Sequence, residues 1–298
     1  MQRFLRKVVV FMMFPILYFG GNMMANYVFY NNQTISLKNT AVLIAGDSHP
    51  QTSLNPKYFD DAQNIAQPAE PYVLTYWKLK KIFNSYIPDT LIIGFAPQNI
   101  SKFNDLKFSN EKWSSEMFKR SYPIEEFNEI STMINVDYTN FYKTLWKQTA
   151  FYPKKNHINY IGSYSNSKNS EISDSETTAK RHYYQNGIEL GVSELAINYL
   201  DSIVELSISK KINLIMVSNP VHEQYLKKIP RSIMKKYANL TYKYNVNHVV
   251  FDKTTAYYPD SLYLNSDHLN ENGAKRFTTE LVKYLKSKTR AHNNVYTK

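Results

Sequence analysis

The chain has 298 residues, a net charge of +11 and 43% hydrophobic residues, enough apolar material for a large packed body rather than a disordered chain. It contains no cysteine, which excludes disulfides, thiolate chemistry and cysteine-ligated metals. The lysines are scattered without a basic motif, so the charge does not indicate nucleic-acid binding. We predict neither a metal nor a cofactor.

The N-terminus carries Arg3, Arg6 and Lys7, followed by uncharged sequence to residue 36. This pattern is typical of a signal peptide or signal anchor. No small-x-small cleavage site follows, and the segment can reach the ~20 residues that a membrane span needs. We therefore predict an uncleaved membrane anchor over residues 1–30 and a polar linker over 31–40. A buried N-terminal strand or helix is the alternative.

The positive residues before the apolar segment also predict a topology. The positive-inside rule places the N-terminus in the cytoplasm and the body outside it, in the periplasm or at the cell surface. The protein would then be a single-pass membrane protein.

Residues 41–45 form an apolar run that predicts a buried strand, and Gly46, Asp47 and Ser48 follow it directly. Glycine permits a sharp turn at the end of the strand. Ser48 would then lie at the carboxyl end of a first strand, where open α/β sheets place their chemistry. The alternative is an ordinary turn with a serine that caps the next helix.

Strands and helices are predicted to alternate along the rest of the chain. This alternation indicates an α/β fold: a flavodoxin-like, three-layer α/β/α domain over residues 41–298 with a mostly parallel sheet of about five strands. The further strands are expected at 62–66, 90–95, 212–217 and 248–252, and the helices at 72–86, 191–209, 223–245 (interrupted by Pro230) and 274–286.

A large insertion, about residues 101–188, follows the third strand. Its aromatic residues are too numerous for a linker, so we expect part of it to pack beside the sheet. Residues 163–178 are instead polar, which predicts a mobile loop that forms a substrate wall or lid, or a decoration without a role.

A second motif opens the last helix, where residues 265–274 read NSDHLNENGA. Together with the Gly-Asp-Ser of residues 46–48, it resembles the SGNH (GDSL) hydrolase superfamily over roughly residues 38–290. In that family the serine is a nucleophile and the late histidine its base. The resemblance implies these roles for Ser48 and His268, and the Leu-Asn-x-x-Gly after the histidine matches as well.

The third member of the catalytic triad departs from the family pattern. The family aspartate stands three residues before the histidine, where this chain has Asn265. An asparagine orients the histidine in papain-like sites, so we predict Asn265 as the orienting residue. Asp267 is the alternative, although adjacent side chains seldom orient each other.

The resemblance also implies an oxyanion hole that includes the Ser48 N–H. The family carries a glycine in the block that corresponds to residues 64–70, and this chain has none there. A backbone N–H of Gln67, Ala69 or Glu70 can still serve, and we take Ala69 as the candidate.

A side-chain amide completes the oxyanion hole in the family. Ala96 stands at the position of the family asparagine, so Gln98 or Asn99 would have to supply this amide. His49 and His222 also follow predicted strands, and we expect them to contact substrate.

Taken together, the resemblance implies a serine esterase or O-acyltransferase, closest in layout to membrane-anchored, outward-facing envelope members. Its expected substrates are acyl or acetyl esters of cell-envelope glycan, with a membrane acyl-donor protein as a further partner. The alternative is a non-catalytic glycan-binding component of an envelope polysaccharide assembly or export machine. The missing glycine and Asn265 favour that alternative, whereas Ser48 and His268 oppose it.

Overall fold

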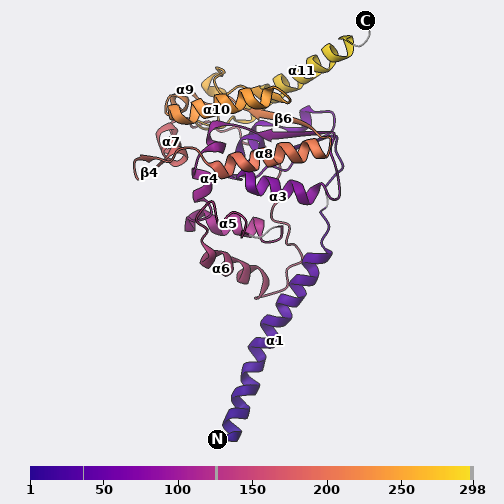
Figure 1. Cartoon of the computed structure of the whole chain (residues 1–298), viewed down its shortest axis with the longest axis vertical. Helices are drawn as coiled ribbons and strands as arrows, with labels where there is room; N and C mark the ends of the chain where they lie inside the picture. Colours follow the sequence, from indigo (N-terminus) through magenta and orange to yellow (C-terminus); the bar gives the residue numbers. More distant parts are fainter. Residues whose placement is uncertain (36, 125–126, 296–298) are drawn as a thin grey trace. The chain divides into compact units, whose positions relative to one another are not determined.

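Five short strands form one parallel sheet in the computed structural model, which describes residues 1–35, 37–124 and 127–295 (Figure 1). The strand order β2-β1-β3-β6-β7 is the flavodoxin-like order, in which the first strand lies between the second and the third. The predicted α/β fold with about five parallel strands is confirmed. The strands are β1 (Val42–Ala45), β2 (Ala62–Asn64), β3 (Thr90–Gly94), β6 (Asn213–Ser218) and β7 (Val249–Asp252).

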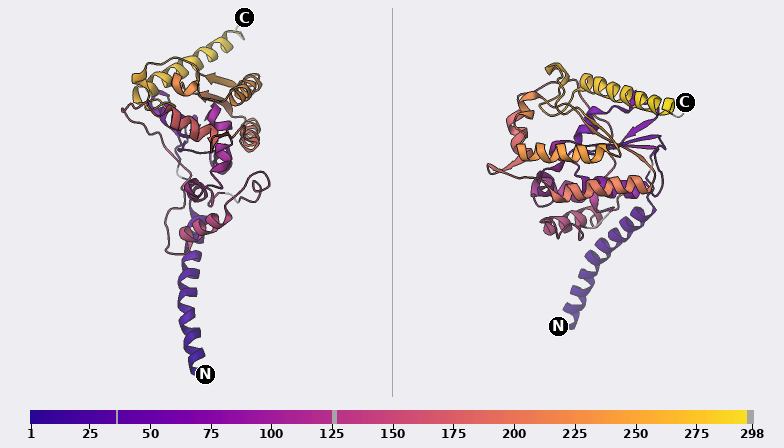
Figure 2. Two further views of the ribbon diagram at one scale, coloured as in Figure 1. Left: turned by 90° about the vertical axis from the view of Figure 1, so that its left-hand side faces the viewer. Right: turned by 45° about the horizontal axis from the view of Figure 1, so that its top comes forward.

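Helices cover both faces of this sheet. Successive strand residues point to opposite faces, and consecutive residues such as Leu43 and Ile44 are both fully buried. Ile44 packs in one core cluster with Phe277 of α11 (Glu271–Val295). Figures 1 and 2 show α3 (Tyr72–Ile82) and α8 (Glu194–Ser209) on the other side of the sheet from α11.

The predicted helix over 223–245 is divided at Pro230 into α9 (Glu223–Leu226) and α10 (Arg231–Asn245). Proline lacks an N–H and fits the start of a helix, which explains the division. The remaining helices of the part described are α2 (Ser48–Ser53), α4 (Phe103–Leu106), α5 (Glu111–Ser121), α6 (Tyr138–Thr149), α7 (Ser175–Tyr183) and the 3₁₀ turns η1 (Pro56–Tyr58), η2 (Pro97–Ile100) and η3 (Asp260–Leu262).

A hairpin of β4 (Tyr184–Gln185) and β5 (Ile188–Glu189) was not predicted. Its two turn residues, Asn186 and Gly187, have φ values of 51° and 81°. Asn-Gly with positive φ at both positions is the signature of a type I′ hairpin turn, so this dipeptide was the signal in the sequence.

The predicted insertion is divided between two compact units. The first unit comprises Met1–Ser36 and Lys107–Tyr160, and the second comprises Leu37–Leu106 and Ile161–Lys298 with the sheet. Residues 163–174 form an irregular loop, and α7 begins at Ser175. The mobility of this loop stays a prediction.

In the first unit, α1 (Gln2–Asn32) is long and apolar enough to cross a membrane. It extends two residues past the predicted anchor. The side-chain amide of Asn26 donates to Thr149 O (2.6 Å), and that of Asn22 donates to Ala150 O (3.0 Å). These asparagines therefore satisfy carbonyls that the end of α6 leaves without an intrahelical partner.

Candidate active site

Ser48 lies in a tight turn between β1 and α2. Gly46 has φ of +121°, and a Cβ there would lie 3.1 Å from Gly94 N, so the close approach to β3 requires glycine. The Asp47 side chain caps α2 by accepting a hydrogen bond from His49 N (3.0 Å). The turn thus places Ser48 at the carboxyl edge of the sheet, as predicted.

The structure brings Ser48 and His268 together across 220 residues of sequence. His268 Nε2 lies 2.7 Å from Ser48 Oγ, and His268 Nδ1 lies 2.8 Å from Asp267 Oδ1. Because Nδ1 faces a carboxylate, it carries the proton and leaves Nε2 as the acceptor for the serine hydroxyl. This is the arrangement that a general base needs to activate a serine.

Both candidates for the orienting residue reach His268. Asn265 Oδ1 lies 3.1 Å from Nδ1, but it also accepts hydrogen bonds from the backbone N–H of His268 (2.9 Å) and of Asp267 (3.2 Å). Asn265 therefore organises the turn, and Asp267 is the closer and charged partner. Adjacent residues do contact each other here, contrary to the expectation from the sequence.

Asp267 is fully buried. Burial alone raises the pKa of its carboxyl group, but the charge and hydrogen bond of His268 and the hydrogen bond of His49 outweigh that effect. The pKa of Asp267 is consequently held well below its usual value, and the group is a carboxylate at neutral pH.

His49 shares this carboxylate. Its Nε2 lies 3.3 Å from Asp267 Oδ2, and its ring meets the His268 ring edge to face at 4.6 Å between centroids. The side chain is buried, so the structure places His49 behind the triad as a support for Asp267 and not on a surface that substrate contacts directly.

The two amides after β3 are engaged inside the protein. Asn99 Nδ2 donates to Asp47 Oδ2 (2.7 Å), and its Oδ1 accepts from Ala96 N (2.9 Å). Gln98 Nε2 lies 3.0 Å from His49 Nδ1. These contacts fix Asp47 and His49. Both amide nitrogens are therefore turned to these two side chains, contrary to the expectation that one of them completes the oxyanion hole.

The turn at residues 67–70 runs beside the serine turn, because Gln67 N donates to Gly46 O (3.0 Å). Ala69 occupies the third position of this turn with φ of +58°. This left-handed conformation costs a residue with a Cβ ~1–2 kcal/mol. The predicted N–H donor therefore lies in a strained turn next to the nucleophile's own turn.

A buried ion pair that was not predicted from the sequence supports this turn. Lys78 Nζ donates to Glu70 Oε2 (2.7 Å) and to Ile65 O (2.9 Å), and both charged side chains are almost completely buried. One ammonium thus binds the chain on both sides of the turn. The feature of the sequence that could have indicated this ion pair is Lys78, a lysine among apolar neighbours in the segment that forms α3.

His222 is the N-cap of α9, where its ring accepts a hydrogen bond from Gln224 N (3.3 Å). Its Nε2 lies 3.3 Å from Asp260 Oδ1, and its backbone N–H donates to Ser266 O (2.9 Å). The structure therefore gives His222 a capping role beside the triad loop. Contact with substrate stays a prediction.

His49, Asp267 and His268 also form a group that could hold a metal ion, since their ligand atoms lie within 4.8 Å of one another. However, both ring nitrogens of His268 already lie within hydrogen-bond distance of Ser48 and Asp267. A metal would have to displace at least one of these contacts. The hydrogen-bonded arrangement therefore fits a serine triad better than a metal centre.

The fold is similar to those of two solved bacterial proteins. One is a GDSL-like lipase from Bacteroides thetaiotaomicron, with 12% identity, a TM-score of 0.40, and coverage of 90% of this chain and 98% of that one. The other is a lipase/acylhydrolase from Enterococcus faecalis, with 12% identity, a TM-score of 0.39, and coverage of 83% and 96%. No family model and no curated protein matches the sequence. The assignment of a function therefore rests on the site's own geometry.

Proposed function

We propose that this protein is a serine esterase or O-acyltransferase of the SGNH type. The observation that carries the proposal is the contact of 2.7 Å between Ser48 Oγ and His268 Nε2, with Asp267 at 2.8 Å from Nδ1. A hydroxyl is a weak nucleophile, and a base at this distance can remove its proton during attack.

In the proposed reaction, Ser48 Oγ attacks the ester carbonyl while His268 Nε2 takes the hydroxyl proton. The tetrahedral intermediate then expels the alcohol, which receives that proton from His268, and the acyl group stays on Ser48. Water or another hydroxyl attacks the acyl-enzyme in the same way and releases the product. Asp267 holds the imidazole tautomer and stabilises the imidazolium formed in each step.

The oxyanion would be bound by backbone N–H groups. Ser48 is the first residue of α2, so its N–H has no acceptor within that helix. The Ala69 N–H lies in the neighbouring turn. We propose these two as the donors, since Gln98 and Asn99 are engaged with His49 and Asp47.

We propose that the substrate is an acyl or acetyl ester of a cell-envelope glycan, and that transfer would use a membrane acyl-donor protein. Hydrolysis and transfer share the acyl-enzyme and differ only in the acceptor. The apolar helix α1 and the resemblance to outward-facing envelope members support this substrate class.

The test is hydrolysis of p-nitrophenyl acetate by the full chain in detergent. We expect Ser48→Ala to lower the rate at least ~10³-fold. The matched control is Ser266→Ala, a buried serine in the triad loop whose Oγ has no hydrogen-bond partner among the residues described. A rate retained in Ser48→Ala would contradict the proposal.

A non-catalytic glycan-binding protein is the second candidate. The observation that favours it is that both amides after β3 are turned to Asp47 and His49 and not to the nucleophile. If the wild-type protein neither hydrolyses the ester nor reacts with a serine-directed probe, this second candidate is the better account.

We also propose that α1 anchors the protein in a membrane with the N-terminus in the cytoplasm. Arg3, Arg6 and Lys7 lie at its N-terminal end, and positive residues beside a membrane span favour the cytoplasmic side. Protease added to intact spheroplasts should digest the body. Protection of the body, or cleavage near Ala25 during export, would contradict the anchor.

A further inference from the structure

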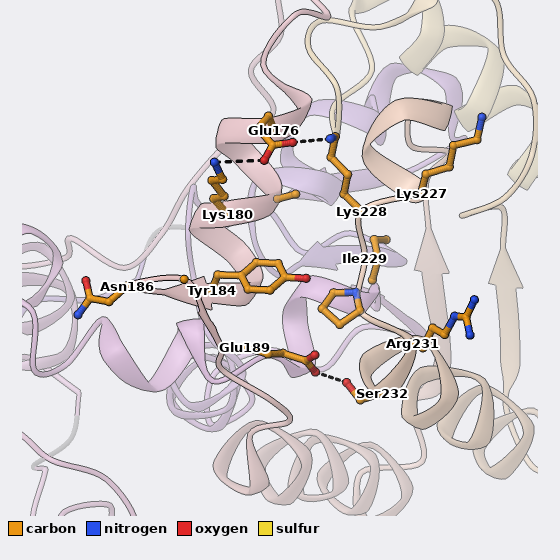
Figure 3. A pocket seen from close by; sticks show the side chains of 13 residues that line it. Glu176, Lys180, Tyr184, Asn186, Glu189, Lys227, Lys228, Ile229, Arg231 and Ser232 are labelled. Atoms are coloured by element: carbon orange, nitrogen blue, oxygen red, sulfur yellow. Dashed lines mark hydrogen bonds and ion pairs between the residues drawn. The ribbon is translucent and has the colours of Figure 1, made fainter.

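A groove of about 920 Å³ lies in the second unit, outside the triad (Figure 3). It is formed by α7, the β4–β5 hairpin and the connection from α9 to α10. The residues that line it are Glu176, Ala179, Lys180, Tyr184, Asn186, Gly187, Glu189, Lys227, Lys228, Ile229, Pro230, Arg231 and Ser232. This volume falls within the range of ~300–1,000 Å³ that is usual for ligand-binding clefts.

Basic side chains outnumber acidic ones in this groove. Lys180 and Lys228 both contact Glu176, and the hydrogen bond from Lys228 is the main reason that the pKa of Glu176 is lowered. The second carboxylate, Glu189, accepts a hydrogen bond from Ser232. Lys227 and Arg231 have no carboxylate of the lining as a partner among the residues described, so the groove carries surplus positive charge.

Arg231 is the cation best suited to a ligand. It lies at the start of α10, and it makes no ion pair within the described part of the chain. Its planar guanidinium can bind a carboxylate or a phosphate through two parallel hydrogen bonds. Lys227 pairs with Glu223 outside the lining, and it would add a point charge at the same wall.

An aromatic ring and a rigid wall complete the groove. Figure 3 shows the Tyr184 ring extending across it toward Ile229. Tyr184 begins the hairpin, whose type I′ turn fixes the backbone of the wall. An aromatic face offers apolar contact area together with a polar hydroxyl, which suits the C–H face and the hydroxyls of a sugar ring.

Of the elements that form the groove, α7 also borders the triad loop, because its N-cap residue Asp174 accepts a hydrogen bond from Ser266 N (2.9 Å). His182 Nδ1 of α7 lies 2.7 Å from the Tyr225 hydroxyl of α9, and Tyr225 donates to the Tyr183 hydroxyl (3.0 Å). Burial raises the pKa of Tyr225, and the charge of Asp267 adds to the effect. The buried end of α7 thus contacts α9, while Glu176, Ala179 and Lys180 of α7 line the groove.

We propose that this groove binds an anionic sugar unit of a glycan, with its carboxylate or phosphate on Arg231 and its ring against Tyr184. The proposal rests on the proposed function and specifies its substrate class: an ester-bearing glycan that carries negative charge. The glutamate and asparagine side chains of the lining supply acceptors for sugar hydroxyls, which a site for a bare polyanion would not need.

The experiment measures binding by the full chain in detergent, with fluorescence anisotropy of labelled oligosaccharides. The probes are a galacturonate hexasaccharide, a phosphorylated maltohexaose and the neutral maltohexaose, and the two charged probes distinguish a carboxylate from a phosphate ligand. We expect one charged probe to bind at least tenfold more tightly than the neutral one. Arg231→Gln and Tyr184→Ala should each weaken this binding about tenfold or more.

The matched control is Lys235→Gln, an exposed lysine of the same helix that does not line the groove. It removes the same charge and should change binding less than twofold. Equal loss in Lys235→Gln and Arg231→Gln would show attraction by net charge alone and overturn the proposal. Failure of both charged probes to bind, or equal binding of the neutral probe, would also overturn it.

The proposed reaction is tested separately in the wild-type protein, because p-nitrophenyl acetate carries no sugar and no charge. Ester hydrolysis without binding of the charged probes would remove the groove proposal and leave the reaction. Binding that depends on Arg231 without any hydrolysis would remove the reaction and leave the groove as a glycan site.

Discussion

Asp267 Oδ1 lies 2.8 Å from Nδ1 of His268, the next residue in the chain. Neighbouring side chains usually diverge, and the turn organised by Asn265 makes this contact possible. The side-chain Oδ1 of Asn265 accepts hydrogen bonds from the backbone N–H groups of both residues, which holds the loop in a tight turn. The aspartate that orients the histidine is thereby supplied from within the loop.

This relationship predicts unequal roles for the two orienting candidates. Asp267→Asn should lower kcat for ester hydrolysis by up to ~10⁴-fold, the loss that follows a wrong imidazole tautomer in a serine protease. Asn265→Ala should lower it only about fivefold, through the loss of turn hydrogen bonds worth ~1 kcal/mol. Steady-state kinetics of both variants give the comparison, and the reverse order would assign the orienting role to Asn265.

The strained turn beside the nucleophile predicts that glycine at position 69 does not destabilise the protein. Ala69 has φ of +58°, where glycine is unstrained, so Ala69→Gly should keep the stability or raise it by up to ~1 kcal/mol. Ala69→Val, with a branched Cβ, should lose stability and activity. Thermal unfolding and ester hydrolysis are the measurements. A clear loss of stability in Ala69→Gly would mean that the turn does not have this conformation.

We predict that replacing only Lys78 of the buried Lys78–Glu70 ion pair strongly lowers the stability of the protein. Replacing both charged residues should restore most of it. Lys78→Met leaves Glu70 buried without its cation and should cost ~3–5 kcal/mol of unfolding free energy. The double variant Lys78→Met/Glu70→Gln removes the stranded charge, and the introduced amide can still accept from Thr75, so most of the stability should return. Ile65 O keeps its bond from Gly162 N (3.1 Å) in both variants. Denaturant unfolding that shows no recovery in the double variant would count against the pair.

His49 predicts a pH dependence of stability. Burial lowers its pKa, but the charges of Asp47 and Asp267 and the hydrogen bond that His49 donates to Asp267 outweigh burial, so the pKa is raised. A raised native pKa adds stability that is complete below the unfolded value of ~6.5 and is lost as the pH rises through the native value.

The measurement is the thermal midpoint of the wild type and of His49→Gln from pH ~5.5 to ~8.5, a range that brackets the ordinary histidine pKa. The difference in thermal midpoint between the wild type and His49→Gln should be largest at the acidic end of this range and should decrease as the pH rises. Protonation of Nδ1 also needs the Gln98 amide to rotate and present Oε1, which has no partner among the residues described. An advantage that grows with pH would show that His49 is neutral throughout this range.

Strands β1, β3, β6 and β7 could be predicted because each contains a short apolar run, whereas β2 has the sequence AQN and does not. Ser48 and His268 could be predicted because each lies in a recognisable motif, Ser48 shortly after β1 and His268 shortly before α11. Their contact joins residues 220 positions apart, and it was expected because the family resemblance pairs the two motifs as nucleophile and base.

The other site contacts depend on side-chain directions that no spacing encodes. Whether Asn265 or Asp267 orients His268 depends on how one turn folds. The roles of Gln98 and Asn99 depend on whether their amides meet a buried imidazole or a buried carboxylate. Lys78 is a polar residue inside an apolar helix face, and its partner Glu70 lies beyond the usual helical spacing. Packing of separate segments decides each of these outcomes.

The most direct test of the central claim is the mass of the intact full-length protein after reaction with a fluorophosphonate. The geometry predicts one covalent adduct, located at Ser48 by peptide fragmentation, that is absent in Ser48→Ala and formed much more slowly in His268→Ala. An adduct that persists in Ser48→Ala, or a wild-type protein that forms none, would contradict the assignment of Ser48 as an activated nucleophile.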